Sequence, residues 1–301
     1  MRNACIDELL AAAAADSRIC LIVGDLGFSV VEPFAARFPG RFLNSGVNEQ
    51  AMTGIAAGMA LAGLKPFTYS IANFPTLRCL EQIRNDVCHH AADVVVVAVG
   101  AGFAYGPLGH SHHAVQDLAC LRSLPGMLLA TPADPLETRA AVRALVRLGG
   151  PAYLRLGKGG DPVLHAAAPD LAVGQPVALA AGGPDAVLAC GGIASEAVAA
   201  ANEHGAAAYS LPLWRDDAPT RDALIGLVAA HRRLVVVEEH VRAGGVGSFV
   251  REALAERGEL HGRLRCLAID PQALAQVGSV AALRRLAGID RQAISAALTG
   301  P

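Results

Sequence analysis

The sequence predicts two open α/β domains, each built on a doubly wound, largely parallel sheet with helices on both faces. A chain of 301 residues can form two domains that each bury a core. Short apolar runs alternate with helical patterns, which is typical of parallel sheets. A stretch rich in Gly, Pro and Ala breaks this alternation. We therefore expect a first domain at 1–158, a linker at 159–184 and a second domain at 185–301.

In the first domain, Val-rich apolar runs bounded by Gly or Pro indicate strands that are buried on both faces. They lie at 20–24 with its flanks, 65–70, 93–99, 127–131 and 152–156. Helical patterns lie near 2–15, 48–62, 76–91, 114–123 and 134–147. The linker is expected to hold one short strand at most. In the second domain, strands are predicted at 185–190, 206–211, 233–240 and 265–269, with helices near 194–203, 220–230 and 247–257.

The composition excludes several classes of protein. Hydrophobic residues make up 53% and charged residues 17%, which suggests that some surface is buried against other subunits. A net charge of −2 gives no reason to expect a nucleic acid or an anionic membrane as partner. The seven cysteines never form CxxC, so we expect neither disulfides nor zinc, and a reducing cytoplasm. Asp7 and Glu8 argue against a signal peptide, and no run reaches transmembrane length.

Polar residues beside glycines follow several predicted strands, where open parallel sheets bind ligands. The sequence GAGFAYG at 100–106 is a poor dinucleotide fingerprint, because Tyr105 stands where a glycine is needed. His110, His112 and His113 share a loop, but carboxylates or thiolates at metal-ligand spacing are missing, so we expect no metal ligands here. Glu49, for its part, fits an exposed acid in the first turn of a helix, and its residue type alone favours that interpretation.

An ordered series of segments resembles the pyrimidine-binding domain of transketolases and 1-deoxyxylulose-5-phosphate synthases. The series reads GDLGFS, NSGVNEQAMTGIAAGMALAGLKPFTYS, FPTLRCLEQIRNDV, GHSHHAVQDLACLRSLPGM and ATPADPLE. The segment VVVEEHVRAGGVGSFV at 235–250 is similar to the carboxyl-terminal domain of the same enzymes. The resemblance covers nearly the whole chain. It implies a cofactor, thiamine diphosphate (ThDP), that supplies its own electron sink.

The resemblance also implies roles for individual residues. Glu49 falls where a carboxyl group bonded to the aminopyrimidine N1′ helps the cofactor's amino group take the C2 proton, and apolar burial favours the protonated acid that this requires. Asp25 and Leu26 match the loop bordering the cofactor, and Phe74 matches a ring stacked on the pyrimidine. His112 matches a catalytic histidine near the reacting oxygens. The expected substrate-binding residues are Arg2, Ser29, His112, His113 and Arg155, of which Arg2, Ser29 and Arg155 fall where the family grips a phosphate.

Two features separate this chain from ordinary transketolases. Leu108 replaces the aspartate that reads a sugar hydroxyl, and Gly100 replaces a second phosphate-contacting histidine, so the substrate is expected to differ. The family's GDG segment, which holds the diphosphate and Mg²⁺, is missing. We therefore expect a split enzyme, with the Mg²⁺ ligands on a partner chain in an α2β2 assembly.

The expected reaction is transfer of a two-carbon ketol unit from a ketose (phosphate) donor to an aldehyde or other electrophilic acceptor, in a specialised sugar or secondary-metabolite pathway. Two alternatives stay open. One is the β subunit of a 2-oxoacid dehydrogenase, which shares the domain order, although EQIRND and GHSHH look closer to transketolase. The other is a non-catalytic scaffold, which would have no need of Glu49.

Overall fold

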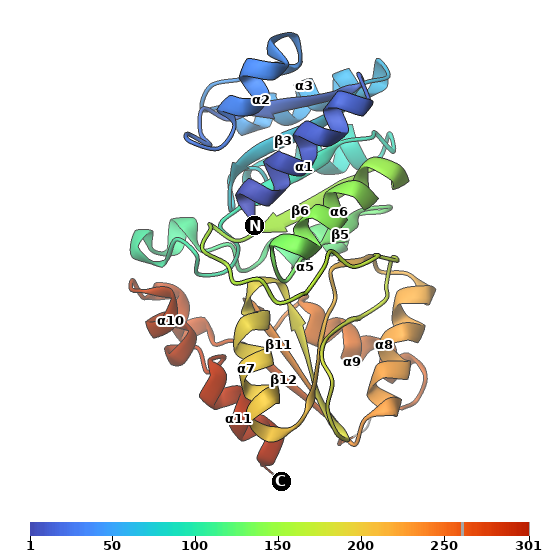
Figure 1. The fold of residues 1–301 in the computed structure, drawn as a ribbon, viewed down its shortest axis with the longest axis vertical. Helices are drawn as coiled ribbons and strands as arrows, with labels where there is room; N and C mark the ends of the chain where they lie inside the picture. Colours follow the sequence, from blue (N-terminus) through green and yellow to red (C-terminus); the bar gives the residue numbers. More distant parts are fainter. Residues whose placement is uncertain (260–261, 301) are drawn as a thin grey trace.

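A computed structural model describes residues 1–259 and 262–300. Two α/β units, each with its own sheet, lie end to end along the long axis of the molecule (Figure 1). The amino terminus lies near their junction, and the chain ends at the far tip of the second unit (Figure 1). The predicted fold class is confirmed, with an antiparallel edge strand added to each sheet.

The first sheet has seven strands in the order β10-β5-β6-β4-β3-β1-β2. All its neighbours are parallel except β10 and β5. Its strands are β1 (Ile19–Val23), β2 (Phe42–Asn44), β3 (Lys65–Ile71), β4 (Val95–Val99), β5 (Leu128–Ala130), β6 (Ala152–Leu156) and β10 (Leu213–Trp214). Strands β1, β4, β5 and β6 are buried along their whole length, as their continuous apolar sequences predict.

The helices of this unit are α1 (Arg2–Ala15), α2 (Glu32–Arg37), α3 (Glu49–Leu61), α4 (Leu80–Gln82), α5 (Asp117–Arg122) and α6 (Pro135–Leu148). Short turns are η1 (Pro39–Arg41), η2 (Leu77–Cys79), η3 (Ile83–Cys88), η4 (Gly106–Leu108) and η5 (His110–His112). Local sequence sets the helix starts: the side chains of Asn48 and Asp134 accept hydrogen bonds from the first turns of α3 and α6. The single helix predicted at 76–91 is divided into η2, α4 and the wider turn η3.

The second sheet has five strands in the order β12-β11-β8-β9-β7. They are β7 (Val177–Ala180), β8 (Asp185–Cys190), β9 (Ala207–Ser210), β11 (Arg233–Val241) and β12 (Leu264–Ile269). The helices are α7 (Ala194–His204), α8 (Ala218–Ala230), α9 (Val246–Glu256), α10 (Val280–Leu286) and α11 (Arg291–Thr299), with turns η6 (Gly191–Ile193) and η7 (Pro271–Ala275). Strand β7 is the short strand expected in the linker, and it pairs antiparallel with β9.

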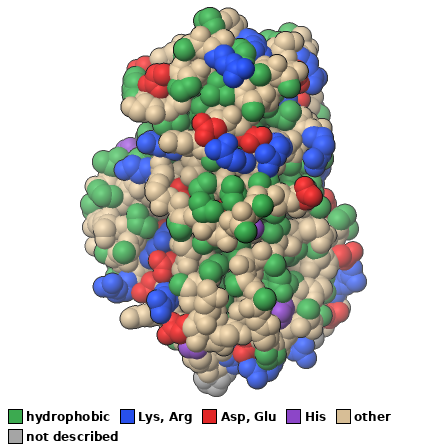
Figure 2. All heavy atoms as spheres, viewed as in Figure 1, with side chains coloured by type: hydrophobic (Ala, Val, Ile, Leu, Met, Phe, Trp, Pro, Cys, Tyr) green, Lys and Arg blue, Asp and Glu red, His purple; other side chains and the backbone are tan. Residues whose placement is uncertain are grey.

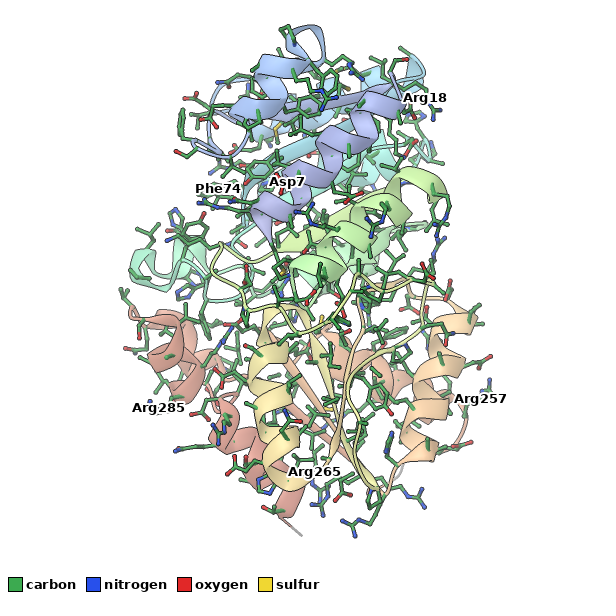
Figure 3. The ribbon with its side chains drawn as sticks, in the orientation of Figure 1. Asp7, Arg18, Phe74, Arg257, Arg265 and Arg285 are labelled. Atoms are coloured by element: carbon green, nitrogen blue, oxygen red, sulfur yellow. The ribbon has the colours of Figure 1, made fainter. Side chains whose placement is uncertain are left out.

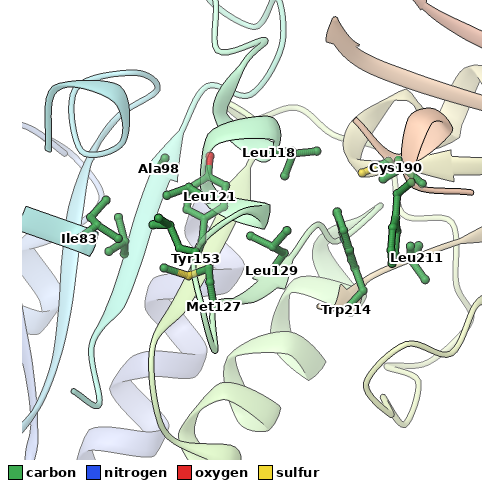
Figure 4. Packing of buried hydrophobic residues seen from close by; sticks show 14 of the residues in the cluster. Ile83, Ala98, Leu118, Leu121, Met127, Leu129, Tyr153, Cys190, Leu211 and Trp214 are labelled. Carbon is green, nitrogen blue, oxygen red and sulfur yellow. The ribbon is translucent and has the colours of Figure 1, made fainter. Parts of the chain in front are cut away.

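The two units share a core at their junction. Strand β10 follows β9 in sequence but joins the first sheet, so Trp214 lies between the units. Its ring stacks on Phe249 of α9 at 5.5 Å, and its Nε1 donates to Thr131 at 3.1 Å. Figure 4 shows Trp214 in one layer with Leu129 and Tyr153 of the first sheet and Leu211 of the second unit. The two units are therefore joined by a shared hydrophobic core.

Candidate functional site

The candidate site lies beyond the carboxyl ends of β1, β3, β4 and β6, where the sequence predicts ligand binding. Its centre is Glu49, the first residue of α3, whose side chain is only 1% exposed. Ser70 donates to Glu49 Oε1 at 3.0 Å, and Arg78 Nη1 donates to Oε2 at 3.0 Å. A Cβ on Gly24 would stand 3.4 Å from Oε1, so the loop after β1 borders the carboxyl group. An exposed first-turn acid is therefore the wrong description of Glu49.

A chain of contacts between side chains leads from Glu49 across the site. The guanidinium of Arg78 lies over the half-buried ring of Phe74, 4.6 Å from its centroid. The Phe74 ring meets the His112 ring edge-on at 5.3 Å, and Tyr105 follows at 6.1 Å from His112. Figure 3 shows Phe74 on the side of the first unit where the turns 106–112 project. The structure thus brings Glu49, Phe74 and His112 into one continuous site.

The loop after β1 holds the other expected cofactor residues. Asp25 and Asn44 exchange two hydrogen bonds, at 2.9 and 3.1 Å, and Asp25 has a positive φ of 55°. Leu26 is half-buried against the core, and exposed Ser29 also has a positive φ, 65°. Such left-handed backbone is rare for residues with a Cβ, so this loop has one specific shape.

A second part of the site carries positive charge. Arg2 and Lys158 line one hollow of about 680 Å³. Lys158 also lies over the Tyr105 ring at 4.9 Å, which links this hollow to His112. Arg139, at the edge of the hollow, instead pairs with Asp7 of α1 at 2.8 Å. Figure 2 shows these opposite charges as a band over α1 and α6. Arg2 and Lys158 thus share this hollow with the acidic residues Asp7 and Asp161.

Two expected substrate residues face elsewhere. Arg155 is 2% exposed. Its Nε donates to Asp117 Oδ2 at 2.7 Å. Its Nη2 donates to the backbone carbonyls of Ala114 at 2.8 Å and Glu239 at 3.0 Å. Since these donors are occupied inside the protein, Arg155 is a junction residue and cannot grip a phosphate in this arrangement. The His113 ring is 1% exposed, packs on Phe103 at 5.1 Å, and has a pKa lowered by burial. The His113 side chain is therefore a core residue in this structure.

Sequence reasoning missed Lys158 and Arg78. Lys158 stands between glycines just beyond the end of β6, which is itself a signal for a ligand-facing cation. Arg78 has no such signal, because its meeting with Glu49 depends on how η2 folds back over α3. Within the described residues, no cluster of three or more His, Cys, Asp or Glu could hold a metal. Nor does any helix of residues 1–259 and 262–300 have the length and apolar character to cross a membrane.

Comparison with known proteins identifies the family. The transketolase pyrimidine-binding domain matches residues 1–160, and the transketolase C-terminal domain matches residues 181–294. An apulose-4-phosphate transketolase subunit of Phocaeicola vulgatus is 33% identical over 85% of this chain and 83% of its own. The corresponding subunit of Actinobacillus succinogenes is 30% identical over 98% of this chain and 96% of its own. A solved split-gene transketolase, described as an inactive beta4 tetramer, superposes with a TM-score of 0.83 at 31% identity, covering 99% and 96% of the two chains.

The chain therefore belongs to the transketolase family of ThDP-dependent enzymes. Within it, the chain is a transketolase subunit of the split type, made of the pyrimidine-binding and C-terminal domains. A 6-deoxy-6-sulfo-D-fructose transketolase subunit of Clostridium is also similar, 30% identical over 85% of this chain and 81% of its own. The predicted family and domain order are confirmed.

The residues present fit one end of the cofactor. A buried carboxyl group beside a half-buried aromatic ring matches a flat, apolar heterocycle with a basic nitrogen. The diphosphate end needs cations or a metal, and the described residues hold no group of three or more His, Cys, Asp or Glu that could bind a metal.

Proposed function

We propose that this chain forms the pyrimidine half of a ThDP site, and that the assembled enzyme transfers a two-carbon ketol unit from a ketose donor to an aldehyde or other electrophilic acceptor. The observation that carries the proposal is the buried Glu49 carboxyl group beside Phe74. When bound, ThDP supplies the electron sink for cleaving the carbon–carbon bond. Every other task at this half of the site falls to the side chains of this chain.

Glu49 Oε2 would bond to the aminopyrimidine N1′, since the carboxyl group is buried at the base of the site and its other oxygen already accepts from Ser70. Ser70 would fix the carboxyl plane through its bond to Oε1. Phe74 and Leu26 would hold the pyrimidine between them, and the Asp25 loop would shape the pocket edge. His112, oriented by the bond between its Nδ1 and Ser111 Oγ at 2.9 Å, would donate to the reacting oxygen.

Arg2 and Lys158 would bind the anionic end of the substrate, with exposed Ser29 as a further candidate for the phosphate. Relatives named for apulose 4-phosphate and for 6-deoxy-6-sulfo-D-fructose support a substrate that ends in a phosphate or a sulfonate. Leu108, 56% exposed, stands in the same loop as His112 and presents an apolar group in place of a hydroxyl-reading acid. We infer a specialised sugar pathway.

The partner would dock on α3. Its outward face carries Gly54 and Gly58, whose added Cβ atoms would meet no atom within 4 Å, beside Ile55 and Leu61, which are 40% and 62% exposed. Small residues allow close helix packing, and exposed apolar ones reward it. The partner would bring the Mg²⁺ and diphosphate ligands, and two copies of each chain would give an α2β2 heterotetramer. All seven cysteines, which lie within the described residues, are free, and this favours the cytoplasm as the compartment.

The decisive experiment is Glu49→Gln in the enzyme reassembled with its partner. Gln keeps the size of the side chain but cannot exchange a proton with N1′. Exchange of the C2 hydrogen of bound ThDP for deuterium should slow by at least about 10²-fold, while ThDP still binds. Exchange at the wild-type rate in the variant would reject the ThDP role of Glu49 and leave it as an acid that only caps helix α3. Reductive acylation of lipoamide by the wild-type assembly would decide for the 2-oxoacid dehydrogenase.

A further inference from the structure

Arg78 makes two contacts that coincide with those the proposed cofactor needs. Its Nη1 pairs with Glu49 Oε2 at 3.0 Å, and its guanidinium lies over the Phe74 ring, 4.6 Å from the centroid. The proposed aminopyrimidine would bond to the same carboxyl group and stack on the same ring. A planar guanidinium resembles the heterocycle in both respects, being flat and rich in N–H donors.

The pair also explains how the lone chain tolerates a buried carboxyl group. Glu49 is 1% exposed, and Ser70 alone would satisfy only one of its oxygens. A buried carboxylate without a second partner is costly, so Arg78 stabilises the chain before the cofactor binds.

Arg78 is free to leave, however. Its side chain is 47% exposed, whereas its backbone is held by the bond from Gln50 Nε2 to the Arg78 carbonyl at 3.2 Å. The side chain can swing to solvent while η2 stays in place. Because the Arg78 side chain is half-exposed, solvent can hydrate its guanidinium once it leaves, and the cofactor would replace it at Glu49.

We propose that Arg78 is a positioning residue that occupies the aminopyrimidine's place in the unliganded chain and is displaced when ThDP binds. The proposal rests on the proposed function. In this role Arg78 keeps Glu49 buried and correctly oriented, and the apparent ThDP affinity falls in proportion to the fraction of molecules whose pocket is open.

The test compares ThDP binding by calorimetry to the enzyme reassembled from its partner and wild-type, Arg78→Ala or Arg78→Lys chains. Removing the competing side chain should tighten ThDP binding by about three- to tenfold in the Ala variant. Lys keeps a positive charge but cannot cover the ring, so its gain should be smaller. Arg84→Ala, which removes an arginine bonded to Asn85 in the adjacent turn η3, is the matched control and should leave the affinity unchanged.

A second measurement needs no cofactor. In the lone chain, Arg78→Ala should lower Tm by a few degrees, since it leaves Glu49 without its cation, and adding Glu49→Gln should recover most of that loss.

Unchanged or weaker ThDP binding in both Arg78 variants, with tight binding by wild type, would show that Arg78 does not occupy the aminopyrimidine's place. The proposed function would still stand. If the Ala variant fails to assemble, unchanged affinity of the Lys variant overturns this role of Arg78. A wild-type assembly that binds no ThDP would overturn the proposed function and this inference together.

Discussion

Arg155 and Lys158 are close in sequence but have opposite environments. Arg155 lies within β6, and its side chain enters the junction, where Asp117 neutralises it. Burial alone would raise the pKa of Asp117, but the charge of Arg155 reverses this and holds that pKa below its usual value. Lys158 lies past the strand end and is exposed. One cation is thus committed to structure, and the other is available to a ligand.

Separate substitutions should distinguish these roles. Arg155→Met leaves the Asp117 carboxylate buried without a cation, so the free energy of unfolding should fall by about 3–5 kcal/mol, measured by denaturant titration. Lys158→Met should change stability by less than about 0.5 kcal/mol, yet raise KM for phosphorylated substrates by an amount matching about 1.5–3 kcal/mol. Equal effects on phosphorylated and unphosphorylated substrates would contradict the anion-binding role of Lys158.

The family resemblance of their segments pointed to Glu49, Phe74 and His112, whereas residue type alone favoured an exposed Glu49. They could not give side-chain direction. His113 follows His112 directly, yet one ring meets Phe74 and the next packs on Phe103 inside the core. Arg78 was missed for the same reason, since its contact with Glu49 spans 29 residues of sequence and depends on the path of the chain.

Helix α9 shows how a buried acid can organise an element. Glu238, near the end of β11, accepts from the backbone N–H groups of Val246 and Gly247 at 2.7 and 2.9 Å, which lie in the first turn of α9. Burial nevertheless raises the pKa of Glu238 to about 7, against the lowering effect of these bonds. Two residues further along, burial lowers the pKa of His240 to about 4.

These two groups give stability opposite pH dependences. A raised acid pKa means that the folded chain binds the extra proton, so Glu238 contributes stability below its unfolded pKa, and this is lost as pH rises through about 7. The lowered pKa of His240 means that its contribution to stability is present above its ordinary pKa of 6.5. This contribution is lost as pH falls from 6.5 to about 4. Between pH 6.5 and 8 only the Glu238 effect remains of the two.

We expect wild type to lose about 1 kcal/mol of unfolding free energy between pH 6.5 and 8 through Glu238. Glu238→Gln has no proton to lose, so its stability curve should be flatter by that amount, although lower overall because one backbone N–H of α9 loses its acceptor. Urea titrations at several pH values provide the measurement, and parallel curves for the two proteins would show that Glu238 does not titrate in this range.

At the level of elements, the buried apolar runs were predicted well: β6 and β8 begin and end where expected, and Val-rich β11 ends one residue later. Such runs carry a strong pattern because both faces of the strand are buried. Strand β10 has only the residues Leu213–Trp214, too few for any periodicity, and its place in the first sheet depends on the junction. The sequence also did not reveal that residues 76–91 form three short helical segments, η2, α4 and η3. Their apolar residues keep a spacing close to that of a single α-helix.

Across the whole molecule, the junction and the partner surface have different characters. Trp214, Phe249 and Tyr153 are fully buried in the core that the two units share. This packed core fixes the placement of one unit relative to the other. The partner surface is instead left open, with small and apolar residues of α3 facing outward. Phe28 and Val47, 73% and 76% exposed, are further exposed apolar side chains, on the loops next to Asp25 and Glu49. The proposed half-site therefore borders the proposed partner surface, while the two units are joined by a packed core.

This arrangement predicts that the lone chain lacks measurable affinity for ThDP, because the groups expected to bind the diphosphate and Mg²⁺ are on the partner. Calorimetry of the lone chain with ThDP and Mg²⁺ should give no binding heat, whereas an equimolar mixture with the partner should bind tightly and only with Mg²⁺ present.

Ile55→Glu on the outward face of α3 should prevent assembly, since it places a charge in an apolar interface. That variant should lose ThDP binding in the mixture while the lone chain keeps its Tm. Tight, Mg²⁺-dependent binding by the lone chain would mean that it carries both halves of the site, and the split arrangement would be wrong.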